Sequence, residues 1–269
     1  MIRHTSSLTG VPETALWTLF DRASEARRPQ GVLHDPDAVR ICDEIAYDYL
    51  GHFGPPSGSH AARAAQTDIV LRQWLKQHPD GMVISLGEGL ETQALRVDNG
   101  AMRWLSVDLP DMLAFRERFL PPDARRRHHP ASALDLGWLA EIDPAQPLFV
   151  VAQGLFMYLE PDGVRALLVE MAERFRDAQI VFDTVPRWFA ALTQQGLPLT
   201  PFYVVPPMPW GIDPEEIEPT LRDWHPRLKV VSYLPYGFPR GWARAVQDIV
   251  TRLPALNVKA ASLIHARIG

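Results

Sequence analysis

Hydrophobic residues in the middle of the chain form short continuous runs, and each run is followed by a stretch with helical spacing. The run at 82–86 ends in Gly87-Glu88-Gly89, and similar runs follow at 103–107 and 147–152. Continuous apolar runs are typical of strands covered on both faces, and their alternation with helices predicts a parallel sheet. The predicted strands of this region are 82–86, 103–107, 128–134, 147–152 and 178–183, with helices from about 90, at 110–119 and at 161–176.

Before this alternation, apolar positions recur at helical spacing. They predict helices at 12–28, 35–50 and 59–77. A nucleotide-binding domain that began with its first strand would not have three helices in front of it. We therefore assign residues 1–80 to an N-terminal helical cap.

The alternation stops after residue 185, where prolines and aromatic residues accumulate up to about residue 226. A segment of this length without a sheet pattern is usually a functional lid or pocket, so 186–226 is interpreted as a lid insertion with short helices at 187–195 and 213–224. Strands at 227–234 and 260–267 and a helix at 240–253 follow, with one of these two strands expected to be antiparallel. The core domain is thus 81–185 with 227–269, and the fold class is α/β.

Polar residues stand at four predicted strand ends. Gly87-Glu88-Gly89 follows the first strand, Asp108 the second, Asp135 the third and Gln153-Gly154 the fourth. Open α/β sheets bind ligands at the carboxyl ends of their strands. A tight turn without a ligand would explain the glycines alone, but four such ends on one edge indicate a site.

The glycine loop limits the choice of ligand. A dinucleotide fingerprint requires a third glycine where this chain has Thr92, and no Gly-Lys-Ser/Thr of a P-loop is present. S-adenosylmethionine, an adenosine without pyrophosphate, fits better. Gly87 and Gly89 would let it lie on the backbone, Asp108 would accept from the ribose hydroxyls, and Asp135 with Leu136 would contact the adenine.

Composition narrows the other possibilities. The net charge of −5 gives no reason to expect nucleic acid as a partner, and the single cysteine, Cys42, excludes an internal disulfide and a cysteine-rich metal site. We expect no metal. The basic run 125–129 is interpreted as a solvated loop. No long apolar run suggests a signal peptide or a membrane span, so a cytoplasmic protein is expected.

At this point the chain resembles the leucine carboxyl methyltransferase family, especially its bacterial branch of tetracenomycin-type polyketide O-methyltransferases. The matching pieces occur in order: Thr14-Ala15-Leu16-Trp17, Arg27-Arg28-Pro29 leading to His34-Asp35-Pro36, Arg63 before Thr67-Asp68, Leu86 to Thr92 for the family's L-G-A-G-L-D-T, Val107-Asp108-Leu109-Pro110, Asp135-Leu136, Gly154 to Leu159, and Trp210-Gly211-Ile212-Asp213. The resemblance implies a class I, Rossmann-like methyltransferase fold with a seven-stranded sheet, and S-adenosylmethionine as cofactor.

The resemblance also implies residue roles. Arg63 would pair with the carboxylate of the cofactor's methionine part. Gln153 stands where the family usually has Glu; its carbonyl can still accept from the cofactor's ammonium group but supplies no charge. Glu91 and Gln93 also depart from the family pattern, so a catalytically weak binding protein is one alternative. A nicotinamide-dependent oxidoreductase is another, which Thr92 disfavours.

We expect methyl transfer to a carboxylate or hydroxyl oxygen of a small, polyketide-like molecule rather than of a protein. A carboxylate needs no general base, whereas a phenol would gain from one. Tyr158, His34 and Asp183 are the candidate bases, and Tyr158 is the catalytic residue that we assign. Aromatic residues of the lid would line the acceptor pocket with Tyr158: Phe202, Tyr203 and Trp210.

Overall fold

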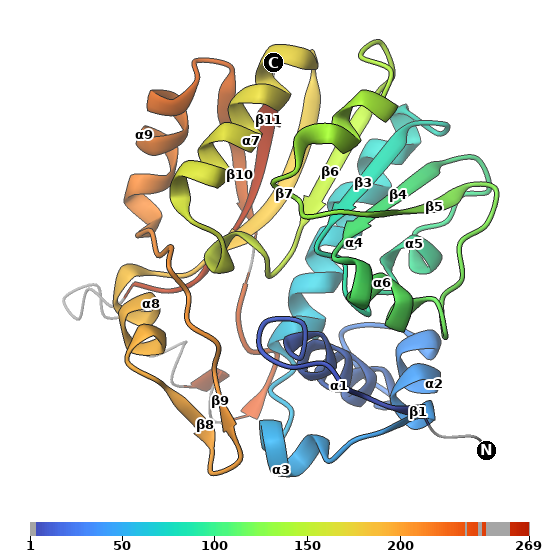
Figure 1. Ribbon diagram of the computed structural model, residues 1–269, viewed down its shortest axis with the longest axis vertical. Coiled ribbons are helices and arrows are strands. Elements are labelled where there is room, and N and C mark those ends of the chain that lie inside the picture. The colour runs from blue at the N-terminus through green and yellow to red at the C-terminus, as the bar shows by residue number, and fades with distance from the viewer. Residues whose placement is uncertain (1–3, 235, 242–243, 246–258, 269) are drawn as a thin grey trace.

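The computed structural model describes residues 4–234, 236–241, 244–245 and 259–268 (Figure 1). Its central sheet has seven strands in the order β10-β11-β7-β6-β3-β4-β5. β11 is antiparallel to both of its neighbours, and the remaining strand pairs are parallel. The strands are β3 Met82–Leu86, β4 Arg103–Asp108, β5 Arg126–Pro130, β6 Leu148–Ala152, β7 Ala178–Thr184, β10 Leu228–Leu234 and β11 Ser262–Ile268.

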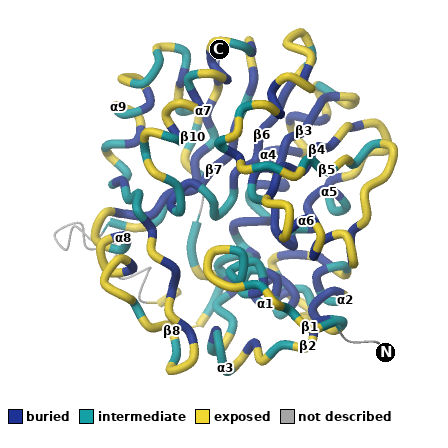
Figure 2. The backbone as a smooth tube through the Cα atoms, viewed as in Figure 1, coloured by how far each residue is buried: buried dark blue, intermediate teal, exposed yellow. Residues whose placement is uncertain are grey.

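The central strands are apolar because both faces of the sheet are covered. Every residue of β3 and β6 is buried, as the dark tube in Figure 2 shows. One face packs against α7 (Pro161–Arg174) and α9 (Pro214–Trp224), and the other against α4 (Ser59–Gln77) and α5 (Gln93–Arg96). The predicted seven-stranded class I methyltransferase fold is confirmed.

The predicted N-terminal helices are present as α1 (Thr14–Ala26), α2 (Pro36–Glu44) and α4. The predicted helix at 35–50 is interrupted after Glu44, where β2 (Ile45–Ala46) pairs with β1 (His4–Thr5) before α3 (Tyr49–Phe53) begins. α1 and α2 share an apolar cluster with α6 (Pro110–Arg116), whereas α4 lies against the sheet. The division into cap, core and lid remains a prediction.

The lid segment contains α8 (Arg187–Gln194) and α9, close to the predicted helices. A small antiparallel hairpin of β8 (Pro198–Thr200) and β9 (Tyr203–Val204) lies between them and was not predicted. Most of the helix predicted at 240–253 lies outside the described residues.

The prediction for the strand at the β5 edge was wrong in two respects. The strand ends at Pro130 instead of residue 134, because Pro130 pairs with Asp108, the last residue of β4, and the partner strand goes no further. The basic run 125–129, interpreted as a loop, forms most of this strand. Its side chains pair with acidic neighbours, as Arg125 does with Asp98 and His129 with Glu141.

Candidate cofactor and acceptor sites

The loop after β3 depends on its two glycines. Gly87 and Gly89 have φ values of 57° and 56°, which side-chain-bearing residues rarely adopt. A Cβ on Gly87 would lie 2.8 Å from Cδ1 of Leu155, so a side chain there would also clash with the loop after β6. The bare backbone of this loop forms one wall of a cavity of about 290 Å³.

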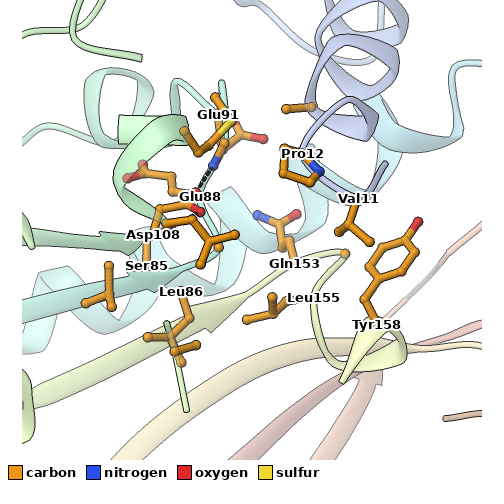
Figure 3. A pocket seen from close by; sticks show the side chains of 18 of the residues that line it. Val11, Pro12, Ser85, Leu86, Glu88, Glu91, Asp108, Gln153, Leu155 and Tyr158 are labelled. Carbon is orange, nitrogen blue, oxygen red and sulfur yellow. Dashed lines mark hydrogen bonds between the residues drawn. The ribbon is translucent and has the colours of Figure 1, made fainter. Parts of the chain in front are cut away.

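This first cavity lies at the carboxyl ends of β3, β4 and β6, with the segment before α1 on its far side (Figure 3). Six residues predicted from the sequence line it together: Arg63, Gly87, Gly89, Asp108, Gln153 and Tyr158. Val11 and Pro12, which the sequence did not mark, lie across from the glycine loop. Residues that the sequence assigns to separate strand ends and to α4 thus come together around one cavity.

Asp108 is held at the end of β4 by backbone donors. Its Oδ2 accepts from Gly89 N at 2.7 Å and its Oδ1 from Leu109 N at 2.8 Å. A carboxylate has about four acceptor positions, so two hydrogen bonds leave capacity for a ligand. Burial raises the pKa of this carboxyl, against the opposing effect of the Gly89 and Leu109 amides.

Gln153 directly follows β6, and its side chain lies in the wall of the cavity (Figure 3). Neither Oε1 nor Nε2 has a hydrogen-bond partner among the residues that the structure describes, although both atoms are buried. A buried polar group without a partner costs about 1–3 kcal/mol. The amide is thus placed to bind a polar group of a ligand.

Arg63 of α4 lies beside the same cavity in a buried ion pair. Its Nη1 is 2.7 Å from Asp183 Oδ2, and Gly154 N donates to Asp183 Oδ1 at 2.6 Å. Burial disfavours the guanidinium charge, but the charge of Asp183 outweighs burial and raises the pKa of Arg63. Residue 154 must lack a side chain, because its φ is 67° and a Cβ would lie 3.1 Å from Arg63 Nη1.

Asp135 and Leu136 do not line this cavity. Asp135 is exposed and caps the short 3₁₀ helix η1 (Leu136–Glu141) by accepting from Gly137 N at 3.2 Å. They lie away from the cavity because β5 ends five residues before Asp135. Ala131, Ser132 and Ala133 line that part of the wall instead.

A second, more apolar cavity of about 520 Å³ lies on the other side of Arg63 and Gly154. The two cavities share Thr14, Thr18, Arg63, Gly154 and Tyr158. Apolar lining comes from α1, the loop after β6, the lid, the segment after β10 and the segment before β11. It includes Trp17, Met157, Trp188, Phe189, Met208 and Phe238.

Of the residues predicted for the acceptor pocket, Tyr158 lines the second cavity, whereas the three lid aromatics lie elsewhere. Phe202 is 74% exposed at the tip of the β8–β9 hairpin. Tyr203 packs edge-on against Phe53, and Trp210 packs against Phe156 and Trp224 over the sheet. The lid contributes Trp188 and Phe189 of α8 instead.

The predicted bases also differ in their surroundings. His34 is exposed and lines neither cavity. The Asp183 carboxylate is already paired with Arg63 and accepts a hydrogen bond from Gly154 N. Burial raises the pKa of the Tyr158 phenol well above its usual value of 10, so Tyr158 is suited to donate a hydrogen bond and unsuited to act as a base.

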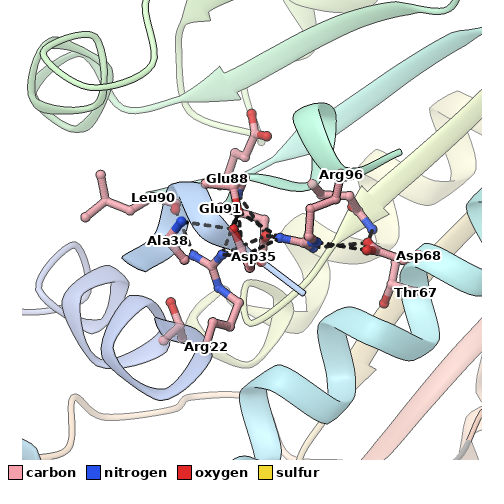
Figure 4. A network of polar contacts seen from close by, with 12 residues as sticks. Arg22, Asp35, Ala38, Thr67, Asp68, Glu88, Leu90, Glu91 and Arg96 are labelled. Atoms are coloured by element: carbon pink, nitrogen blue, oxygen red, sulfur yellow. Dashed lines mark hydrogen bonds and ion pairs between the residues drawn. The ribbon is translucent and has the colours of Figure 1, made fainter. Parts of the chain in front are cut away.

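A buried ionic network behind the glycine loop is the main feature that the sequence did not predict (Figure 4). Arg22 Nη1 and Arg96 Nη1 lie 2.7 Å and 2.8 Å from Asp35 Oδ2. Thr92, at the position of the third glycine in dinucleotide-binding loops, donates to Asp35 at 2.7 Å. The network therefore connects α1 and the start of α2 to the loop that lines the cofactor cavity.

Two departures from the family pattern belong to this network. Glu91 Oε1 pairs with Arg96 at 2.6 Å and with Arg22 at 3.1 Å. Gln93 donates to Asp68 at 2.8 Å, and Arg96 Nε and Nη2 contact the same carboxylate at 2.8 and 3.0 Å. Both residues are thus accommodated by ordered partners.

Comparison with known proteins agrees with this geometry. Residues 15–172 match the family model described as leucine carboxyl methyltransferase. The chain belongs to the leucine carboxyl methyltransferase family. It is an S-adenosylmethionine-dependent methyltransferase, and S-adenosylmethionine is its cofactor.

Two relatives in this family illustrate the likeness. The chain is 33% identical over 187 residues to the tetracenomycin polyketide synthesis O-methyltransferase TcmP of Streptomyces glaucescens, covering 68% of this chain and 69% of that one. It is 30% identical over 192 residues to the S-adenosyl-L-methionine-dependent methyltransferase dpfgK of Gibberella zeae, covering 65% and 64%.

Among solved structures, the N-methyltransferase NodS of Bradyrhizobium japonicum WM9, in complex with S-adenosyl-L-homocysteine, superimposes with a TM-score of 0.51. It is 12% identical, and the match covers 94% of this chain and 98% of that one. This likeness supports the fold. In the described part of the chain, no helix combines the length and apolarity needed to span a bilayer.

Proposed function

We propose that the protein transfers a methyl group from S-adenosylmethionine to a carboxylate or hydroxyl oxygen of a small, largely apolar molecule resembling a polyketide. One observation carries this proposal: the cavity over the glycine loop adjoins a second, more apolar and aromatic cavity, and Arg63, Gly154 and Tyr158 line both. A donor in the first cavity and an acceptor in the second would meet at these residues. The name of the relative TcmP supports an oxygen acceptor of this class.

The residues of the first cavity fit the cofactor. The Asp108 carboxylate has free acceptor positions for two ribose hydroxyls, and Gln153 Oε1 can accept from the ammonium group. Arg63 lines this cavity, and its Nε has no hydrogen-bond partner among the described residues, so its guanidinium can attract the methionine carboxylate. The bound sulfonium supplies an electrophilic methyl group, so the chain's own task is to align the reactants and exclude water.

A catalytically weak S-adenosylmethionine-binding protein is the second candidate, because Gln153 supplies no negative charge to the cofactor's ammonium group. The apolar cavity beside the cofactor cavity favours the enzyme. A protein that only bound the cofactor would have no need of it.

Transfer of an isotopically labelled methyl group to a panel of aromatic carboxylic acids and phenols tests the proposal. We expect label in an oxygen-linked product, either an ester, which mild base hydrolyses, or an ether, which resists it. Label found only on nitrogen or carbon, or S-adenosylmethionine binding without transfer to any acceptor of the panel, would contradict the proposal.

Replacing Gln153 by Glu tests the assigned position of the ammonium group. The added charge should strengthen the hydrogen bond and lower the dissociation constant of S-adenosylhomocysteine about tenfold, as measured by calorimetry. Gln195→Glu, the same change at an exposed position outside both cavities, serves as the control and should leave affinity unchanged. Equal affinities of Gln153→Glu and the parent protein would place the ammonium group elsewhere.

A further inference from the structure

A histidine and a buried aspartate meet at the wall of the acceptor cavity. His60, in the first turn of α4, lines this cavity, and its Nδ1 lies 3.4 Å from Oδ2 of Asp21 in α1. The His60 side chain is 15% exposed, whereas Asp21 is fully buried. The carboxylate is thus shielded, and the imidazole is accessible from the cavity.

Asp21 is fixed by hydrogen bonds that set its direction. Oδ1 accepts from Gly58 N at 2.7 Å, and Oδ2 accepts from His60 N at 2.9 Å. Burial acts to raise the pKa of Asp21, but His60 and these backbone donors outweigh it and lower the pKa to about 2. Asp21 therefore stays ionised beside the ring.

The imidazole also packs against an aromatic residue of α1. Trp17 meets the ring at a centroid distance of 5.2 Å and an interplanar angle of 72°, an edge-to-face contact. The 3.4 Å between Nδ1 and Asp21 Oδ2 is an ion-pair distance without hydrogen-bond geometry, so the carboxylate acts on the ring through its charge. A carboxylate beside Nδ1 favours the tautomer that carries its proton there, which leaves Nε2 to accept a proton.

The other ionisable groups that face this cavity are less suited to accept a proton. Asp183 is paired with Arg63, and Lys259 is paired with Glu215. Burial raises the pKa of Tyr158, and it raises that of Tyr236 to about 12, so both phenols stay protonated near neutral pH. Among the described residues lining this cavity, His60 is the group whose chemistry suits a general base.

We propose that His60, oriented by Asp21, is the general base of the transfer and that the methyl acceptor is therefore a hydroxyl, such as a phenol. The inference rests on the proposed function and narrows it, because a carboxylate would need no base. The acceptor's O–H proton moves to His60 Nε2 as its oxygen bonds to the methyl carbon. The S–CH₃ bond breaks with its electron pair remaining on sulfur, and His60 then releases the proton to solvent. His60 would touch the substrate, and Asp21 would be a positioning residue.

The test uses His60→Gln, with His78→Gln at the opposite end of α4 as the matched control. His78 is part-buried, packs against Trp74 and lines neither cavity. We expect His60→Gln to lower kcat for phenol methylation about 100-fold, with the dissociation constant of S-adenosylhomocysteine unchanged. His78→Gln should keep the rate.

A second readout does not depend on turnover. A hydroxyanthraquinone such as alizarin, whose phenolate absorbs in the visible, is added to the protein saturated with S-adenosylhomocysteine. The parent protein should shift the bound dye toward its phenolate spectrum, and His60→Gln should not. Asp21→Asn should reduce the shift while bound dye remains, provided that far-UV circular dichroism shows intact helices.

The outcomes separate this inference from the function on which it rests. Failure of the protein to bind S-adenosylhomocysteine would contradict the proposed function itself. The base assignment would be overturned by methylation confined to carboxylic acids, by no binding or methylation of any phenol, or by full phenol activity of His60→Gln. Each of these results would leave the proposed methyltransferase in place.

Discussion

Replacing Asp35 by Asn is expected to lower the free energy of unfolding by about 3–5 kcal/mol. Asp35 is fully buried and neutralises Arg22 and Arg96, which lie 2.7 and 2.8 Å from its Oδ2. Removing one charge from a buried ion pair leaves the other charge uncompensated, which accounts for the size of the loss. Asn can still accept from Ala38 N as the cap of α2, so the helix start is preserved.

Urea unfolding followed by tryptophan fluorescence measures this change. Asp37→Asn, two residues along and paired with Arg40 at the surface, is the control and should cost less than about 1 kcal/mol. Equal losses for Asp35→Asn and Asp37→Asn would mean that the buried network does not connect the N-terminal helices to the glycine loop in the way the structure shows.

Replacing Asp108 by Ala should weaken binding of S-adenosylhomocysteine at least about 100-fold. The substitution would remove acceptors for two ribose hydroxyls, and a hydrogen bond to a charged group contributes about 1.5–3 kcal/mol. It would also free Gly89 N, which donates to Asp108 at 2.7 Å, so that the glycine loop loses a support. Isothermal titration calorimetry gives the affinity directly.

Asp111→Ala is the matched control, since Asp111 is an exposed acid in the first turn of α6 and lines neither cavity. It should bind S-adenosylhomocysteine like the parent protein. If Asp108→Ala remained folded by circular dichroism and kept its affinity within about threefold, the ribose would not lie at Asp108.

The sheet and its glycine loop could be predicted because their signals are local. An apolar run followed by Gly-x-Gly fixes a strand, a turn and a ligand wall within ten residues, and Asp108 follows its strand at once. Asp135 was misplaced because its predicted role depended on where β5 ends. That strand ends at Pro130, opposite the last residue of β4, and the local sequence does not show where the partner strand stops.

Side chains that come together across long sequence separations could not be predicted. Arg22 and Thr92 are 70 residues apart, and Asp21 and His60 are separated by almost 40 residues; no periodicity relates them. The prediction for the aromatic residues of the lid was wrong for a different reason. Composition shows that this segment is rich in aromatic residues, but the β8–β9 hairpin and the position of α8 determine that Trp188 lines the cavity while Phe202 lies outside it.

The network of Figure 4 also changes how the departures at Glu91 and Gln93 are interpreted. In sequence they resemble drift in a weakened enzyme. In the structure both bind ordered partners, with Glu91 between Arg22 and Arg96 and Gln93 on Asp68. The departure at Gln153 stands apart, because its amide has no partner among the described residues and is directed toward the cofactor cavity.

Calorimetric titration of the parent protein with S-adenosylhomocysteine, and separately with NAD⁺, tests the central claim most directly. The arrangement of Gly87, Gly89, Asp108 and Gln153 around one cavity predicts saturable binding of one S-adenosylhomocysteine per chain and no heat of binding with NAD⁺. Absence of S-adenosylhomocysteine binding by a folded protein, or tighter binding of NAD⁺, would contradict it.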